Sequence, residues 1–260
     1  MTHSEHSDSS LITVRGLHKN FGERKILQGI DIDVYPEETL VLLGGSGSGK
    51  SVLTKHMVGL MSGDKGDIFI SNENISHLNE RQLGVIRQKM GIMFQNGALF
   101  DSMTVGQNVA FPLIEQGVKD KKEIEQRVAE ALEIVLLGGE QDKMPSDLSG
   151  GMRKRVALAR AIVDRPKVVI YDEPHAGLDP ITADVIDHLI KRLEREFHMT
   201  NIVITHELRS VFRIATRIAF LREGKIYWQG SPEELKQSND PVLVKFLAGE
   251  SNAGSWEVDA

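Results

Sequence analysis

The sequence contains no cysteine among its 260 residues. Disulfide bonds and metal sites built on thiolates are therefore excluded. Long hydrophobic runs are also absent, since a run such as Val156–Val163 is short and interrupted by Arg160. Residues 1–10 are polar and lack the apolar core of a signal peptide. These absences predict a cytoplasmic protein, so that any work at a membrane requires a partner with spanning helices.

An excess of positive charge is missing as well. Lysine and arginine number 31 against 37 aspartates and glutamates, which gives a net charge of −6. That balance argues against a general nucleic-acid-binding surface. The hydrophobic share of 40% is ordinary for a globular protein. A chain of this length can bury one substantial core, with an inserted or appended subdomain.

Short β-rich runs alternate with helical patterns along most of the chain. The runs are residues 11–14, 30–34, 40–43, 68–70, 168–172 and 201–205, and the helical patterns are 52–60, 79–89, 121–136, 149–163, 181–197 and 208–215. Compact apolar runs such as Val168–Asp172 are typical of a buried parallel sheet. The alternation predicts an α/β core in which residues 98–162 form a mainly helical insert.

A glycine-rich segment follows the run at 40–43 and precedes a predicted helix. It reads Gly44, Gly45, Ser46, Gly47, Ser48, Gly49, Lys50 and Ser51. This is the pattern of a phosphate-binding loop, in which glycines let the backbone N–H groups point at phosphates. Lys50 then neutralises phosphate charge, and the Ser51 hydroxyl is placed to ligate Mg²⁺. A merely flexible Gly/Ser loop is the alternative, which the strand–loop–helix context disfavours.

Candidate catalytic groups stand at the ends of other predicted strands. Asp172 can orient Mg²⁺, and Glu173 can accept a hydrogen bond from an attacking water. His206 and Gln95 occupy similar positions, and parallel strands should bring all four groups to one edge, facing the γ-phosphate. Two plainer interpretations remain open: the acidic pair could simply end a strand at the surface, and His206 could be a satisfied structural residue.

A second anion site is predicted at Leu148–Met152, which opens a helix with no strand before it. Free N–H groups and a helix dipole of about half a positive charge suit this terminus to an anion. Two anion sites in one chain imply that two copies share each nucleotide. The basic run Arg153–Arg155 that follows is predicted to be a solvated helix face rather than a lipid-headgroup site.

Together these elements resemble the ATPase subunit of ABC transporters, over about residues 11–247. The resemblance makes Gly44–Ser51 the Walker A loop, Val168–Glu173 the Walker B strand with its catalytic glutamate, Gln95 the Q-loop, Leu148–Met152 the signature, Ala176–Asp179 the D-loop and His206 the switch histidine. Phe21 is placed like the aromatic residue that stacks on adenine. Its alternative is an ordinary core position.

The resemblance implies a P-loop NTPase (RecA-like) core with a mainly parallel sheet, an N-terminal antiparallel β subdomain and the helical insert. The tails would be residues 1–10, taken as disordered, and 248–260, with Trp256 either in solvent or anchored on a neighbouring surface. ATP and Mg²⁺ would bind. The implied residues are Lys50, Glu173 and His206 for catalysis; Phe21, Gly44–Ser51, Gln95, Ser149, Gly150, Gly151 and Asp179 for the nucleotide; and Ser51, Gln95 and Asp172 for the metal.

The same resemblance implies partners. Two copies would dimerise head to tail, so that Ser149, Gly150 and Gly151 of one copy close on the γ-phosphate held by the other. A membrane permease would hold the protein at the cytoplasmic face of the inner (plasma) membrane. The apolar cluster Ala98–Phe100, Met103 and Val105 is predicted to form a groove for a partner helix.

Two positions depart from the usual pattern of the family: Met152 replaces a glutamine, and His175 replaces a serine or threonine. The methionine is informative. With Arg153–Arg160, Phe94–Val105 and Asn108–Leu113 it resembles the ATPase of Mla/MCE-type phospholipid transporters. The expected function is therefore ATP hydrolysis that powers lipid transport, with an MCE-domain protein as a further partner. The alternatives are an importer ATPase for another solute and a soluble ABC ATPase that regulates or assembles other proteins.

Overall fold

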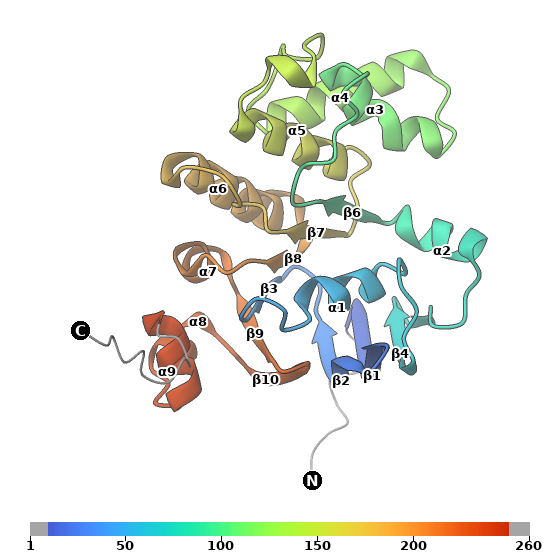
Figure 1. Ribbon diagram of the computed structural model, residues 1–260. Helices are drawn as coiled ribbons and strands as arrows, with labels where there is room; N and C mark the ends of the chain where they lie inside the picture. Colours follow the sequence, from blue (N-terminus) through green and yellow to red (C-terminus); the bar gives the residue numbers. More distant parts are fainter. Residues whose placement is uncertain (1–9, 250–260) are drawn as a thin grey trace.

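The computed structural model describes residues 10–249, which form a central parallel sheet, an antiparallel sheet beside it and a separate group of helices (Figure 1). The predicted tails, Trp256 included, lie almost wholly outside the described residues. Within residues 10–249 no helix has the length and hydrophobicity of a membrane span.

The central sheet has six strands in the order β10-β9-β3-β8-β7-β6. They are β3 (Thr39–Leu43), β6 (Met90–Met93), β7 (Val168–Asp172), β8 (Thr200–Ile204), β9 (Arg217–Arg222) and β10 (Lys225–Gly230). All pairs are parallel except β9 with β10. Every residue of β3 and β8 is buried, as expected for strands covered on both faces. The predicted α/β fold with a mainly parallel sheet is confirmed.

The antiparallel sheet has the order β2-β1-β4-β5. Its strands are β1 (Ile12–Phe21), β2 (Arg24–Val34), β4 (Lys65–Ile70) and β5 (Glu73–Asn74). The predicted run at residues 11–14 covers only the start of β1. The pairing of β1 with β2 shifts register between Val14 and Leu17 and again later, which breaks the alternation of buried and exposed residues.

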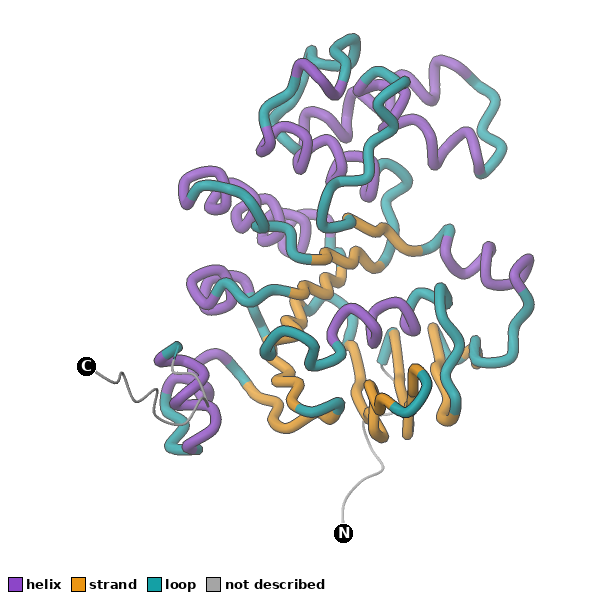
Figure 2. The backbone as a smooth tube through the Cα atoms, viewed as in Figure 1, coloured by secondary structure: helices purple, strands orange, loops and turns teal. Residues whose placement is uncertain are grey.

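Nine α-helices fall within residues 10–249. They are α1 (Lys50–Met57), α2 (Glu80–Arg87), α3 (Val105–Glu115), α4 (Lys121–Ile134), α5 (Gly150–Ile162), α6 (Pro180–Phe197), α7 (Leu208–Ile214), α8 (Pro232–Lys236) and α9 (Pro241–Ala248). Helices flank the central strands on both sides (Figure 2). Val41 and Leu43 of β3 join the core that contains α3 to α7, whereas Leu40 and Leu42 join the core beneath α1 and the antiparallel sheet.

Helices α3, α4 and α5 group together at the top of Figure 1. All three lie within residues 98–162, the segment that was predicted to form a helical insert. The sequence did not predict α3, because it contains Pro112, which removes one backbone hydrogen bond and disfavours a helix interior. A capping box between Thr104 and Gln107 starts the helix, and Val109 and Leu113 are fully buried. Capping and burial therefore outweigh the cost of the proline.

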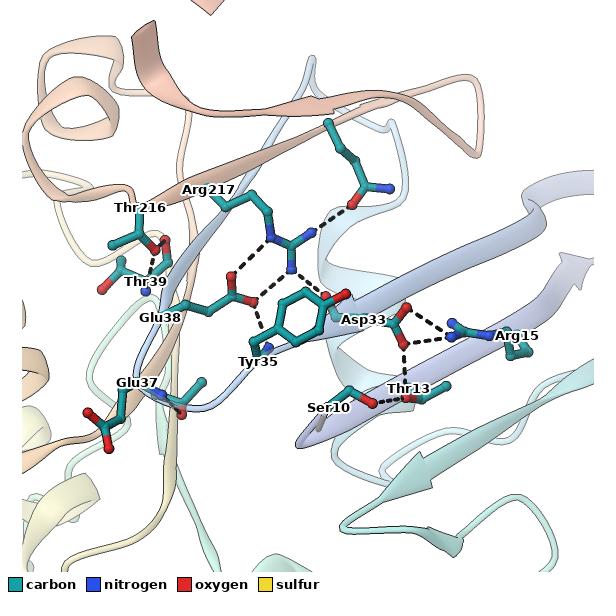
Figure 3. Close-up of polar contacts among 12 residues, drawn as sticks. Ser10, Thr13, Arg15, Asp33, Tyr35, Glu37, Glu38, Thr39, Thr216 and Arg217 are labelled. Carbon is teal, nitrogen blue, oxygen red and sulfur yellow. Dashed lines mark hydrogen bonds and ion pairs between the residues drawn. The ribbon is translucent and has the colours of Figure 1, made fainter. Parts of the chain in front are cut away.

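Arg217 joins the two sheets (Figure 3). Its guanidinium grips the Glu38 carboxylate through two bonds of 2.7 and 3.0 Å and also donates to the Asp33 carbonyl. The Tyr35 ring lies 5.1 Å from the guanidinium, and the Tyr35 N–H donates to Glu38. Because Glu38 is buried, its carboxylate needs the hydrogen bonds that this partner donates.

Removal of the Arg217 side chain, the joint between the two sheets, should destabilise the protein strongly. Arg217→Ala leaves the buried Glu38 carboxylate unpaired, so we expect the free energy of unfolding to fall by about 2–4 kcal/mol. The matched control is Arg15→Ala, which breaks a more exposed ion pair with Asp33 and should cost under about 1 kcal/mol. Urea unfolding of the nucleotide-free protein measures both. Equal losses for the two variants would contradict the assignment.

Candidate nucleotide-binding site

The phosphate loop connects β3 to α1, and its shape requires glycine at two positions. Gly44 has a φ of 151°, and a Cβ there would lie 2.3 Å from the Leu221 carbonyl oxygen. Gly49, the N-cap of α1, has a φ of 109°, and its Cβ would lie 2.9 Å from the Leu27 side chain. The loop is thus wedged against β9 and β2, and no larger residue fits at these two points.

Lys50 begins α1 and is buried. Its Nζ donates to the carbonyl oxygens of Gly44 and Gly45 at 2.8 and 3.0 Å, which spans the loop. Burial lowers the pKa of Lys50, and the nearby Glu173 and Asp172 carboxylates oppose that shift. An ammonium group has three hydrogens, so one remains for a phosphate oxygen. The Ser48 hydroxyl is also buried and has no hydrogen-bond partner among residues 10–249.

Hard oxygen donors gather beside the start of α1. The Ser51 hydroxyl donates to Asp172 at 3.4 Å. Burial and, next, the Glu173 carboxylate raise the pKa of Asp172. No cluster of three or more histidine, aspartate or glutamate side chains suited to a metal occurs in the described part of the chain. Mg²⁺ does not need one, because it is usually held by one or two protein oxygens together with substrate phosphates. The donors therefore fit Mg²⁺ bound with a nucleotide.

Glu173 and His206 meet directly. His206 Nδ1 lies 2.9 Å from Glu173 Oε2, and the glutamate side chain is mostly buried while the histidine is exposed. Glu173 has a φ of 47°, a left-handed conformation that costs a non-glycine residue about 1 kcal/mol or more. The Glu173 N–H bonds to the Ile204 carbonyl at 2.9 Å, which ties its turn to β8. Asp172 and Glu173 are both half-buried at the end of β7, which favours a site over an ordinary surface end of a strand.

Gln95 and Phe21 are two other residues outside the loop that were predicted to bind the nucleotide. Gln95 is exposed just beyond β6, at the same edge of the sheet as Asp172. Phe21 ends β1, and its side chain is 49% exposed, so the alternative of a core position is wrong. Phe21 lies at the β1–β2 turn, and the Leu27 contact described above places β2 against the loop. A ring exposed at that turn is accessible for stacking.

The signature segment is separate from the loop and opens a different helix. Ser149 is the N-cap of α5, where its hydroxyl accepts from the Met152 N–H at 3.2 Å. Ser149 and Gly150 are exposed, while a Cβ on Gly151 would lie 2.3 Å from the Thr182 side chain. Met152 is half-buried and packs on the larger core. Its replacement of glutamine therefore leaves the exposed N-terminus of α5 intact.

Asp179, in the predicted D-loop, caps α6. Its carboxylate accepts from the Ile181 and Thr182 N–H groups at 3.0 and 3.1 Å and from the Thr182 hydroxyl. These hydrogen bonds, those from Thr182 foremost, lower the pKa of Asp179. Ile181 follows on the first turn with 80% of its side chain exposed.

The predicted solvated face at Arg153–Arg155 is wrong for Lys154, which is buried, whereas Arg153 is exposed and Arg155 is half-buried. Arg153 donates to the Leu148 carbonyl at 2.6 Å, and Arg155 donates to the Leu136 carbonyl at 2.7 Å. Lys154 is buried, and its Nζ donates to the carbonyls of Gln95 and Glu173, the latter at 3.3 Å. Burial lowers the pKa of Lys154. Helical periodicity does not reveal that these basic side chains donate hydrogen bonds to backbone carbonyls of neighbouring segments.

Lys154 is a buried residue beside the candidate site that the sequence did not reveal. It links α5, the helix opened by the signature, to the backbones of both Gln95 and Glu173. The predicted groove also changes, because Val105 is fully buried in the core and cannot line it. Phe94 and Phe100 are each 41% exposed and remain on the surface.

Comparison with known proteins agrees with this geometry. A family model described as ABC transporter matches residues 27–176, which include the phosphate loop, Gln95, the signature and Glu173. The chain belongs to the ABC transporter family. It is 39% identical to the intermembrane phospholipid transport system ATP-binding protein MlaF of Haemophilus influenzae, over 94% of this chain and 93% of that protein.

A second relative and one solved structure are also similar to this ABC ATPase. It is 39% identical to the probable ribonucleotide transport ATP-binding protein mkl of Mycobacterium leprae, over 92% of this chain and 69% of that protein. The dimeric post-hydrolysis structure of the ATP-binding cassette MJ0796 with ADP and Pi is 29% identical, with a TM-score of 0.79, over 85% of this chain and 98% of that one. The P-loop NTPase fold and the ATPase activity predicted for this ABC protein are thereby confirmed.

Lys154 gives a test that separates a buried cation from a solvated one. Lys154→Met keeps the aliphatic stem but leaves the half-buried carbonyls of Gln95 and Glu173 without this donor, so we expect the free energy of unfolding to fall by about 1–3 kcal/mol. The kcat for ATP should fall with it, because Glu173 loses a backbone contact. Lys167→Met, the same change at an exposed lysine, is the control. Stability and kcat that match the control would show that Lys154 does not hold the site.

Proposed function

We propose that this protein powers phospholipid transport through a partner permease, as the ATP-hydrolysing subunit of an ABC transporter. The observation that carries the ATPase site is the meeting of Lys50, Ser51, Asp172, Glu173 and His206 at one edge of the central sheet. The lipid assignment is supported by similarity to MlaF over nearly the full length of both chains. Met152, which replaces the usual glutamine of the signature, is one of the residues on which the resemblance to phospholipid-transport ATPases was based.

In this proposal the chain's own groups carry out hydrolysis. Glu173 accepts the proton of the attacking water, and its buried carboxylate is aimed by His206 at 2.9 Å. Lys50 and the loop N–H groups stabilise the charge that develops on the γ-phosphate. Ser51 and Asp172, with Gln95, would hold Mg²⁺, which supplies further neutralisation of phosphate charge. Phe21 stacks on the adenine.

The nucleotide is shared between two copies. Ser149 and Gly150 are exposed at the start of α5, and their free N–H groups face away from the chain's own core. We propose that they close on the γ-phosphate held by Lys50 of a partner. Asp179 and the exposed Ile181 would lie at the same contact. Dimeric structures of the similar cassette MJ0796 support this arrangement.

The permease would dock beside α2, α3 and α5. A groove of about 460 Å³ lies there, lined in part by Arg87, Phe111 and Arg160. Phe100 does not line the groove itself, but it packs on Phe111 with ring centroids 4.9 Å apart and is 41% exposed. Such a groove suits one helix of a partner. Docked in this way, the protein would lie at the cytoplasmic face of the membrane, and an MCE-domain lipid-binding protein would complete the assembly.

A ribonucleotide is the second candidate cargo. The similar mkl protein is named a probable ribonucleotide transport protein, and its identity to this chain equals that of MlaF. An ABC ATPase site acts on ATP in either case, so the cargo is decided by the permease. The MlaF comparison is favoured because it spans 93% of that protein, against 69% of mkl.

The test is recovery of the transporter and its cargo. The tagged full chain, isolated from detergent-solubilised membranes, should bring down an integral membrane permease, and extracts of that complex should contain phospholipid. Phe100→Asp should reduce permease recovery at least about tenfold, because a charge is placed against Phe111, which lines the groove. Leu136→Asp, at an exposed apolar residue that does not line the groove, is the control.

Other outcomes decide against parts of the proposal. Recovery of no membrane protein would contradict the transport function. A complex that carries no phospholipid, but carries ribonucleotide beyond what its ATP sites bind, would favour the second cargo. Equal recovery with Phe100→Asp and Leu136→Asp would remove the groove as the docking site.

A further inference from the structure

A buried polar cluster joins the turn after β7 to two helices. His175 Nε2 lies 2.8 Å from Asp187 Oδ1 on α6, and the Ser210 hydroxyl of α7 donates to Asp187 Oδ2 at 2.9 Å. The exposed fractions of these three residues are 7%, 1% and 2%. A carboxylate only accepts, so Nε2 of His175 carries the hydrogen. The Arg213 guanidinium lies 3.5 Å from the same carboxylate, at its outer side.

The cluster contacts the two segments of the chain that carry Glu173 and His206. His175 is two residues beyond Glu173, in a turn closed by the Ala176 N–H on the Glu173 carbonyl at 3.1 Å. Ser210 lies on α7, which starts two residues after His206. Asp187 therefore fixes both the turn that carries the glutamate and the helix that follows the histidine. The shared anchor keeps the two segments in one register.

This arrangement is costly as a purely structural device. Burial of a carboxylate costs several kcal/mol unless hydrogen bonds replace its water, and apolar side chains of similar volume often give equal or greater stability. Glu173 also has a strained left-handed backbone, which persists only where neighbouring contacts fix it.

We propose that His175, Asp187 and Ser210 are positioning residues that hold Glu173 against His206 for hydrolysis. The proposal rests on the function assigned above to Glu173 and His206, and it adds the element that sets their geometry. When the hydrogen bonds among these three residues, which we call the bridge, are intact, the turn and α7 move together. When it is broken, the turn relaxes and the glutamate no longer faces the water, while the phosphate loop is unaffected. Displacements of about 1 Å at a reacting group cost about a hundredfold in rate.

The test compares two substitutions at His175 in the full chain. His175→Leu removes the donor, and we expect kcat for ATP to fall about 10- to 100-fold while KM stays within about twofold. His175→Gln keeps an amide donor that can reach Asp187, and kcat should return to within about threefold of the parent. A merely structural role would lower the unfolding midpoint without this split and without the rescue.

The matched control replaces another histidine of this region, one that lies outside the buried cluster, with leucine. His188→Leu removes an exposed histidine that lies 3.3 Å from Asp184 on α6, and it should leave kcat and KM unchanged. Ser210→Ala removes a single hydroxyl without a large cavity. It should fold and still lose kcat about 3- to 10-fold, which decides the question if His175→Leu does not fold.

Three results would overturn the proposal: parental kcat in Ser210→Ala, equal kcat in His175→Leu and His175→Gln, or a rise in KM that accounts for the whole loss. Glu173→Gln is measured in parallel. If that variant hydrolyses ATP at the parental rate, the role of Glu173 itself fails, and the result is distinguishable from failure of the bridge alone.

Discussion

The parallel pairing of the central strands is the constraint on which the site depends. Because β3, β8, β7 and β6 all run in one direction, their carboxyl ends share one edge, and adjacent strands are only about 4.8 Å apart. Glu173 and His206 follow neighbouring strands and so come within 2.9 Å. Asp172 is two strands from β3 and is reached by Ser51 from the first turn of α1. The phosphate loop then needs only glycine at the points where it touches β9 and β2.

Buried charges stand at the joints between the layers of this fold. Arg217 and Glu38 join the two sheets, Lys154 joins α5 to the edge of the central sheet, and Asp187 joins α6 to α7 and the Glu173 turn. Apolar contacts would hold these layers together but would not fix their direction. Hydrogen bonds to a buried charge do so, at a cost in desolvation. The joints therefore favour one arrangement of the layers over others that bury similar area.

Local patterns in the sequence predicted the parts of the site that lie at strand ends. The phosphate loop, Asp172, Glu173 and His206 each follow a recognisable apolar run, and the direction of the strands brings them together. The sequence could not reveal contacts between distant segments. Lys154 looks like one residue of a basic helix face, yet it bonds a carbonyl 59 positions away. Pro112 concealed α3, since its local cost is visible in the sequence and the burial that offsets it is not.

The central claim is that one copy supplies the phosphate loop and another supplies the signature. Mixing two inactive variants tests it most directly. Ser149→Arg should block the signature and Lys50→Ala should disable the loop, so each homodimer lacks a complete site. A heterodimer regains one complete site of its two, so an equal mixture should recover about a quarter of the parental ATPase activity. A mixture as inactive as either variant alone, or full activity of Ser149→Arg by itself, would contradict the account.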